Sequence, residues 1–279
     1  MTPVTKALVP MAGADHASLP LQTVLGPGGK PTPLVLHQVE ELFAAGIEEV
    51  CLVVSEASRA AVSPVLAEYF EKIRFVWQKE PLGFGHALWC ARDWAGRDPV
   101  LVQVCDHVFL SSTEVSCVRQ LTKAWDERGA SVCAVQRLKE AEVPRVGVVS
   151  GKRLDQPDTY LLEAFLEKPA LTKAELLPHV PGLGANEYLC SAGIFVLGPV
   201  FFDILEEFAT GGKAGLLRWL APAFAELMRR ESLYGLEFHG RRINLEERLG
   251  LVRAQLAMGL GSADRDALLT LILEEAVRR

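Results

Sequence analysis

The order of apolar patterns in the first half of the chain constrains the fold more than any other sequence feature. Five short runs that are mainly apolar and do not alternate with polar residues predict strands: KALVPM, EEVCLVVS, IRFVWQ, PVLVQVCDHVF and ASVCAVQRL. Helical patterns lie between them: LVLHQVEELFAAG, SRAAVSPVLAEYF, GHALWCARDWA and TEVSCVRQLTKAWDERG. Strands that are apolar at every position are buried on both faces. The sequence therefore predicts an α/β fold in which helices cover both faces of a mixed, mainly parallel sheet.

The second half of the chain has a different pattern. The strand-like pieces VGVVSGKRL, TYLLEAFLEKP and YLCSAGIFVLG are separated by irregular segments, and from Gly250 onward the chain is helical. Because no linker interrupts the sequence, we expect one domain over residues 1–279, with 250–279 as a C-terminal helical extension. Leu268, Leu271 and Ile272 of this extension have two places to pack, the body of the protein or a second copy. We favour the body, since amphipathic helices usually face their own core.

Composition narrows the classes of partner. The formal net charge is -6 and the pI is near 5.6, whereas nucleic acids and acidic membrane surfaces need a clustered basic face. No apolar stretch approaches the ~20 residues that span a bilayer, and the N-terminus has too little apolar sequence for a signal peptide. The six cysteines never show C-x-x-C spacing and lie mostly in apolar runs, as buried, reduced thiols do. We therefore expect a cytoplasmic protein that binds small molecules.

Polar and glycine residues follow several of the expected strands. In doubly wound sheets, ligands bind at the carboxyl ends of the strands. The residues at these positions are those of 13–29 and 78–86, then Asp106, Gly147, Glu167 and Lys168. A site built from them would combine backbone N–H groups, carboxylates and an amine.

The order and spacing of these segments resemble those of a known family. The matching segments are KALVPMAG, AAGIEEVCLVVS, QKEPLGFGHAL, VQVCDHVF, VGVV, FLEKP and SAGIFVL. Taken together, they make the chain similar to the sugar-phosphate nucleotidyltransferases, above all to the bacterial UTP:glucose-1-phosphate uridylyltransferase branch. The resemblance implies a Rossmann-like nucleotidyltransferase fold. It also implies an enzyme that joins a nucleoside triphosphate, UTP favoured, to a sugar 1-phosphate, glucose 1-phosphate favoured, and releases pyrophosphate.

The resemblance also implies roles for the residues that follow the central strands. Asp106 matches an aspartate that binds Mg²⁺, the implied cofactor, and a hard cation of this kind would bridge the carboxylate to phosphate oxygens. Lys168 matches a lysine that holds the sugar phosphate. Glu167 matches a carboxylate that accepts hydrogen bonds from sugar hydroxyls, and Gly147 matches a glycine whose backbone lies beside the sugar.

Nucleotide binding is assigned by the same resemblance. Gln78 matches the residue that recognises the pyrimidine edge, and the backbones of Ala12 and Gly13 match further contacts. Gly83 would let the backbone approach the base and ribose, because glycine tolerates otherwise strained turns. The alternative for Gly83 is a tight connection between a strand and a helix, and both roles are compatible.

The chain departs from the family pattern on the triphosphate side. The family loop has the form G-x-G-T-R followed by a proline and two lysines, whereas this chain has GADHASLPLQTVLGPGGK. Ala17 or a neighbour replaces the arginine, Asp15 adds negative charge, and only Lys30 remains as a substitute cation. At the second metal-binding position Asn244 replaces an aspartate, with Glu246 or Glu247 as possible replacements, and GGKAGLLRWLAPAF replaces an acidic stretch.

Two hypotheses follow from these departures. The first is an active sugar-1-phosphate nucleotidyltransferase that uses Asp106, Lys168 and Lys30 for catalysis and Asp106 with Asn244 for the metal. The alternative is a protein of the same fold that binds a nucleotide sugar or sugar phosphate with little or no turnover, in a regulatory role. We favour the enzyme, because Asp106 and Lys168 are both retained.

Overall fold

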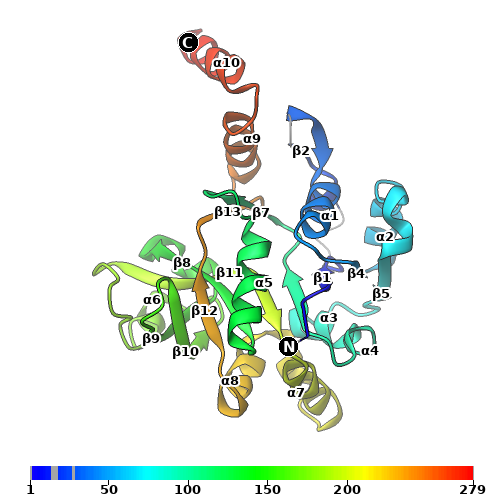
Figure 1. Ribbon diagram of the computed structural model, residues 1–279, viewed down its shortest axis with the longest axis vertical. Coiled ribbons are helices and arrows are strands. Elements are labelled where there is room, and N and C mark those ends of the chain that lie inside the picture. The colour runs from blue at the N-terminus through cyan, green and yellow to red at the C-terminus, as the bar shows by residue number, and fades with distance from the viewer. Residues whose placement is uncertain (1, 14–17, 27–28, 279) are drawn as a thin grey trace.

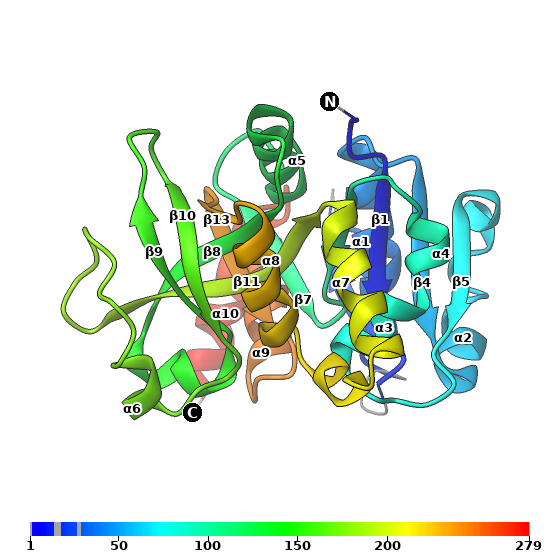
Figure 2. The same cartoon turned by 90° about the horizontal axis from the view of Figure 1, so that it is seen from below.

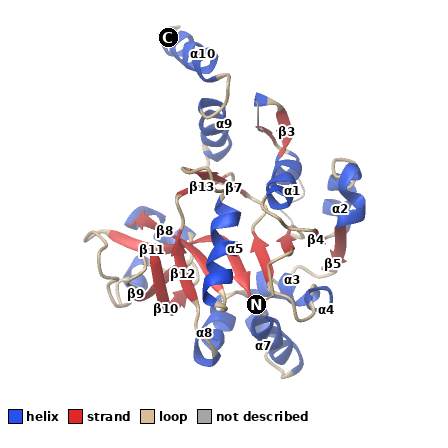
Figure 3. Ribbon diagram, in the orientation of Figure 1, coloured by secondary structure: helices blue, strands red, loops and turns tan. Residues whose placement is uncertain are grey.

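The computed structural model describes residues 2–13, 18–26 and 29–278. In this part of the chain, the main sheet has nine strands that run across the molecule (Figures 1 and 3). In sheet order they are β5 (Ile73–Trp77), β4 (Glu49–Val54), β1 (Lys6–Pro10), β6 (Val100–Gln103), β11 (Glu187–Leu197), β8 (Val132–Lys139), β12 (Tyr234–Glu237), β10 (Thr159–Leu166) and β9 (Val148–Arg153). Two small sheets stand apart from it: β7 (His107–Ser111) with β13 (Gly240–Asn244), and β2 (Thr23–Leu25) with β3 (Pro31–Pro33).

The expected mixed sheet is confirmed, and its two halves differ. Strands β5, β4, β1 and β6 pair in parallel, because helical crossovers join them. Beyond β6 the pairings are antiparallel, apart from the parallel pair of β12 and β8. The parallel order that the sequence predicts therefore holds for the first half of the chain. The later strands pair mostly antiparallel.

Helices cover both faces of the sheet, as expected (Figure 2). One face packs against α3 (Phe84–Cys90), α4 (Arg92–Ala95), α7 (Pro199–Thr210) and α8 (Ala221–Arg230). The other packs against α1 (Leu34–Ala44), α2 (Glu56–Val62) and α5 (Cys117–Arg128). In β1, Leu8 belongs to the first of these cores, whereas Ala7 and Val9 belong to the second. This two-sided burial explains why β1 is apolar at successive positions.

The run PVLVQVCDHVF does not form the single strand that the sequence predicts. The chain leaves the main sheet after Gln103 and enters β7, which pairs with β13 instead. The Gln38 amide bridges the break by donating hydrogen bonds to the carbonyls of Val104 and His107, at 3.2 and 2.9 Å. This break places Asp106 at the carboxyl end of the parallel strands.

Two expected helices are also interrupted. The pattern SRAAVSPVLAEYF forms α2 and then a 3₁₀ helix, η4 (Ala67–Lys72), because Pro64 cannot donate the hydrogen bond that a continuous helix needs. The pattern GHALWCARDWA forms α3 and α4 with a break at Ala91. The remaining short helices are η2 (Leu19–Leu21), η5 (Glu140–Arg145), α6 (Leu171–Ala174) and η6 (Ala214–Arg218).

The C-terminal segment forms two helices. Helix α9 (Gly250–Leu260) packs against β2 and β13 and buries Ala254 and Met258. Helix α10 (Arg265–Val277) extends away from the body (Figure 1), and none of its residues is buried. Our expectation that Leu271 and Ile272 pack on the body is therefore wrong, because they are 55% and 37% exposed. Leu268 alone is partly covered, and it lies beside Gly259 of α9. Within the described residues, every helix is too short or too polar to cross a membrane.

Candidate active site

A cavity of about 380 Å³ lies where the parallel strands end. Its lining comes from segments far apart in the sequence, including the end of β1, the break between β6 and β7, the middle of β11 and the end of β13. Five residues with predicted roles in the sugar or metal site line it together: Asp106, Gly147, Glu167, Lys168 and Asn244. The carboxyl ends of parallel strands meet at one edge, and this explains the convergence.

Asp106 is held tightly at the floor of this cavity. Its side chain is 13% exposed, and its Oδ1 lies 2.6 Å from Nδ1 of His107. Its backbone carbonyl accepts a hydrogen bond from the N–H of Leu245, at 2.9 Å. Asn244 pairs with His107 across the β7–β13 ribbon, and Asp106 directly precedes His107, so the chain brings the two predicted metal ligands to the same end of this ribbon.

Gly147, Glu167 and Lys168 also line this cavity. The N–H of Lys168 donates to the carbonyl of Val146 at 3.1 Å, and this bond joins the end of β10 to the residue before Gly147. Burial raises the pKa of Glu167, and the nearby Lys168 ammonium opposes this effect. Lys168 has a φ of 40°, an unusual value for a residue with a side chain. Such strained positions cluster at functional sites.

A bulge in β11 shapes the third wall. The register of β11 against β8 shifts between Ser191 and Phe195, and Gly193 lies within the shift with a φ of 86°. A Cβ on Gly193 would lie 2.8 Å from a methyl group of Val104. The carbonyl of Gly193 instead accepts a hydrogen bond from the N–H of Val104. Glycine is therefore required here for both its conformation and its small size.

The cavity has the donor chemistry that Mg²⁺ prefers. Asp106, Asn244 and Glu246 line it, each has side-chain oxygen atoms, and hard cations take oxygen ligands. Asn244 Oδ1 also accepts a hydrogen bond from the N–H of Glu246 at 2.8 Å. The described part of the chain contains no group of three or more His, Cys, Asp or Glu residues suited to a metal. Mg²⁺ is commonly held by one or two carboxylates together with substrate phosphates, so these residues fit such a site.

The residues predicted to bind the base do not line this cavity. Gln78 is 5% exposed, and its Nε2 donates to the carbonyl of Gly83 at 3.0 Å and lies 2.9 Å from Nδ1 of His86. Gly83 has a φ of 124°, and a Cβ there would collide with the backbone of Arg218. The structure thus brings Gln78 and Gly83 together, and packing against η6 by itself explains the glycine. Ala12 and Gly13 lie two and three residues after Pro10, which ends β1 and lines the cavity.

The predicted phosphate-binding charge is not at the cavity either. Lys30 is exposed at the start of β3, and its carbonyl accepts hydrogen bonds from the N–H of Gly26 and the hydroxyl of Thr32. The neighbouring Gly29 lies beside Asp264, in the turn that leads to α10. Asp15 and Ala17, which we singled out in the loop after β1, lie outside the described residues.

Among the cavity residues to which we assigned no role from the sequence are two arginines and a tryptophan. Arg145 is the last residue of η5, Trp219 follows η6, and Arg242 belongs to β13. Only Arg242 had a usable signal, because it precedes the predicted ligand Asn244 by two residues and side chains alternate along a strand. The other two reach the cavity through loops whose course the sequence does not reveal.

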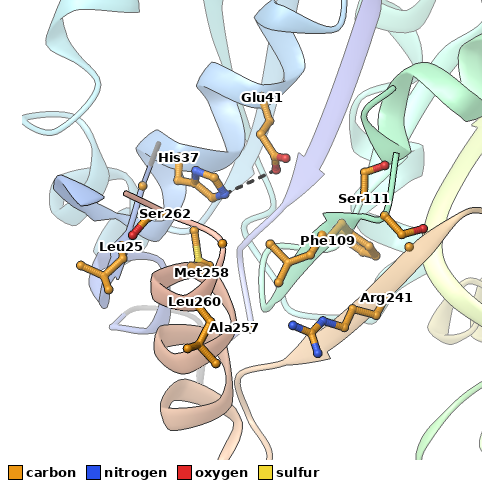
Figure 4. Close-up of a pocket in the computed structure, with 15 residues that line it drawn as sticks. Leu25, His37, Glu41, Phe109, Ser111, Arg241, Ala257, Met258, Leu260 and Ser262 are labelled. Atoms are coloured by element: carbon orange, nitrogen blue, oxygen red, sulfur yellow. Dashed lines mark ion pairs between the residues drawn. The ribbon is translucent and has the colours of Figure 1, made fainter. Parts of the chain in front are cut away.

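A second cavity, of about 670 Å³, lies between α1, α9 and the β7–β13 ribbon (Figure 4). His37 and Glu41 of α1 point toward one another, with 3.6 Å between His37 Nε2 and the Glu41 carboxylate. Leu25, Phe109 and Met258 give the cavity apolar walls. Among the described residues, no lining residue is shared with the cavity around Asp106.

Known proteins resemble this chain over most of its length. It is 28% identical to the UTP--glucose-1-phosphate uridylyltransferase of Bacillus subtilis (strain 168), over 93% of this chain and 92% of that protein. It is 27% identical to UTP--glucose-1-phosphate uridylyltransferase 1 of Staphylococcus saprophyticus, over 92% and 93%.

Solved structures share the fold. A UDP-glucose pyrophosphorylase complexed with UDP-glucose superposes with a TM-score of 0.73 and 24% identity, over 91% of this chain and 98% of that chain. A UTP-bound UGPase from Acinetobacter baumannii gives a TM-score of 0.78 and 21% identity, over 97% and 99%. The family profile described as nucleotidyl transferase matches residues 20–219 and so begins after the divergent part of the loop. With its strands, cavity and sequence all in agreement, the chain belongs to the nucleotidyl transferase family.

Proposed function

We propose that this protein transfers a uridylyl group from UTP to glucose 1-phosphate, giving UDP-glucose and pyrophosphate. One observation carries the proposal: five residues with predicted sugar and metal roles, from separate segments of the chain, line a single cavity at the carboxyl ends of the parallel strands. The substrates are those in the names of the curated relatives, which match this chain over nearly its whole length.

The proposed reaction needs residues that position the two substrates and neutralise their negative charge. An oxygen of the sugar phosphate attacks the α-phosphorus of UTP, the bond from that phosphorus to the bridging oxygen breaks, and pyrophosphate leaves. Both reactants are polyanions, so the protein must hold them in line and offset their charge. In this proposal Lys168 holds the sugar phosphate and Glu167 accepts hydrogen bonds from sugar hydroxyls. Mg²⁺, held by Asp106 and Asn244, would neutralise charge on the phosphates when bound.

The roles of Gln78, Gly83, Ala12, Gly13 and Lys30 stay predictions. Ala12 and Gly13 adjoin the cavity along the chain, and this supports a nucleotide site on the β1 side. The exposed position of Lys30 favours the alternative hypothesis, a protein that binds UDP-glucose without efficient turnover. An ammonium at that position also lacks the bidentate grip of the arginine that it would replace.

A pyrophosphate-release assay separates the two functions. Wild-type protein is incubated with Mg²⁺, each nucleoside triphosphate and a panel of sugar 1-phosphates, beside Asp106→Asn. We expect release with UTP and glucose 1-phosphate, and a fall in kcat of at least about 100-fold in the variant. Asp203→Asn, which changes an exposed carboxylate paired with Arg97, is the matched control and should keep wild-type turnover. Absence of release from protein that binds UDP-glucose in calorimetry would support the binding function instead.

We propose that the protein carries out this activity as a homo-oligomer in the cytoplasm. Helix α10 carries exposed leucines, among them Leu269 at 39% and Leu273 at 65%, and contiguous exposed apolar side chains often mark a protein–protein contact. All six cysteines are free thiols, in keeping with a reducing compartment. Sedimentation velocity gives the oligomeric state, and cell fractionation gives the location.

A further inference from the structure

Positive charge reaches the cavity around Asp106 from outside the loop after β1. Within the described residues, the cationic side chains that line it are Arg145, Lys168 and Arg242. The carboxylates that line it are Asp106, Glu167 and Glu246. The numbers of cations and carboxylates are equal, so the loss of one cation would leave a negative cavity that repels phosphate. Each of the three cations therefore matters for a polyanionic substrate.

Arg242 is the cation that the fold places most firmly. It lies within β13, opposite Phe109 of β7, and two residues before Asn244. Side chains alternate along a strand, so Arg242 and Asn244 both line the cavity around Asp106, whereas Arg241 lines the second cavity. Cys190 is near enough to influence Arg242 electrostatically, and it pairs with Val148, the residue after Gly147. Arg242 thus lines the same cavity as Asp106 and the residues proposed to hold the sugar.

The guanidinium of Arg242 has unused donors. Across the described residues, no carboxylate oxygen lies within 4.0 Å of it, and it donates no hydrogen bond. Neighbouring arginines differ: Arg137 donates to Glu237 at 2.6 Å, and Arg253 lies 3.3 Å from Glu247. Arg242 is half-buried, and none of its nitrogens is among the described side-chain atoms that are both buried and unpartnered, so its N–H donors can exchange water for an anion.

We propose that Arg242 binds the phosphate of the sugar 1-phosphate, which becomes the sugar-linked phosphate of the nucleotide sugar. This inference rests on the proposed function, because it names a residue that holds one of the two substrates. A guanidinium donates two parallel hydrogen bonds to phosphate oxygens, and Lys168 adds a point charge. No bond is made or broken at Arg242. The residue offsets the repulsion between the attacking phosphate and UTP.

Calorimetry with UDP-glucose and with UTP tests this role. UDP-glucose contains the sugar-linked phosphate and UTP does not. We expect Arg242→Gln to weaken UDP-glucose binding by on the order of 10- to 100-fold. UTP binding should change by less than about threefold, since that ligand lacks the phosphate concerned. Arg242→Lys should recover part of the lost affinity for UDP-glucose, because lysine keeps the positive charge but cannot donate two parallel hydrogen bonds. Arg241→Gln, on the other side of the same strand, is the control and should bind both ligands as wild type does.

Steady-state kinetics adds a second readout. The KM for glucose 1-phosphate should rise in Arg242→Gln while the KM for UTP stays near that of wild type. Equal losses for both ligands, or none for UDP-glucose, would overturn the role of Arg242. Wild-type protein that binds UDP-glucose through Arg242 but releases no pyrophosphate would support this inference and refute the proposed activity. If the wild-type protein is active and Arg242→Gln keeps wild-type binding and kinetic constants, the proposed activity is supported and the role of Arg242 is refuted. If the wild-type protein does not bind UDP-glucose, the proposed activity and the role of Arg242 are both refuted.

Discussion

At the scale of single residues, the cavity depends on close contacts that exclude larger side chains. A Cβ on Gly147 would lie 2.6 Å from the ring of Phe165. That ring has little freedom to move, because it is 7% exposed and its centroid is 4.7 Å from that of Phe224. The glycine beside the proposed sugar site is therefore also a packing requirement of the core.

Gly147→Ala should destabilise the fold by about 1–3 kcal/mol, because the added methyl group overpacks a core that cannot yield. Chemical denaturation measures the change in the free energy of unfolding. Gly215→Ala is the control, since no atom lies within 4 Å of the Cβ that it would add. That variant should stay within about 1 kcal/mol of wild type. Equal stability of the two variants would contradict the packing argument.

The carboxyl group of Glu41 should make the unfolding free energy depend on pH. Its side chain is 27% exposed, and burial raises its pKa from 4.5 to about 7. The folded state then holds the proton more tightly than the unfolded state does, so this contribution is fully present below pH 4.5 and is lost as pH rises through about 7. Relative to Glu41→Gln, wild type should lose about 1–2 kcal/mol of unfolding free energy over this pH range. The loss is this small because the Glu41 side chain is partly exposed to solvent, which screens its charge.

Denaturant titrations of wild type and Glu41→Gln at several pH values across this window measure the difference. Glu48→Gln changes an exposed carboxyl just beyond the same helix, and its profile should follow that of wild type. Parallel profiles for wild type and Glu41→Gln would show that the carboxyl does not titrate as described.

At the scale of elements, the break between β6 and β7 builds the site. Had the chain continued as one strand, Asp106 would lie inside the main sheet. Because β7 pairs with β13 instead, Asn244 comes beside His107 and Arg242 comes to the same cavity. Side-chain hydrogen bonds from Gln38 of α1 hold the break, and a periodicity argument does not detect such contacts.

The two C-terminal helices should differ in their effect on stability. A chain that ends at residue 264 loses only α10, which has no buried residue, so its unfolding free energy should stay within about 1 kcal/mol of wild type. A chain that ends at 249 also loses α9, and with it buried Ala254 and Met258. Exposure of that core should cost at least about 3 kcal/mol. Thermal and denaturant unfolding of both truncated chains measure these changes in stability. Equal losses of unfolding free energy in the two chains would contradict the expected difference between α9 and α10.

At the scale of the whole molecule, two hydrophobic cores enclose the sheet and most of the thiols. Five of the six cysteines are buried, and Cys90 is half-buried. Burial raises the pKa of Cys133 in one core and of Cys117 in the other to about 12, and this suppresses the reactive thiolate. The cores therefore protect these side chains both by exclusion and by electrostatics.

Native protein should react with a thiol reagent at Cys90 alone, and denatured protein at all six cysteines. Absorbance of the released chromophore counts the thiols in each state. Cys90→Ser should abolish the fast native reaction. Rapid labelling of several thiols in native protein would indicate that the cores open readily, contrary to this expectation.

The sequence by itself determined the α/β class, the helices on both faces and the residues that follow the strands. It could do so because apolar periodicity depends on burial, and burial on both faces marks the parallel strands. The sequence also indicated the family, because the segments that carry the resemblance occur in the family's order.

Only the tertiary structure decided which strand-end residues share a cavity. It brought Asp106, Lys168 and Asn244 together, left Lys30 exposed on the β2–β3 hairpin and outside the cavity lining, and added Arg242. It also left α10 exposed, although the sequence favoured packing on the body. These outcomes depend on strand pairing across more than 100 residues, as between Asn244 and His107, and local patterns carry no information about such contacts.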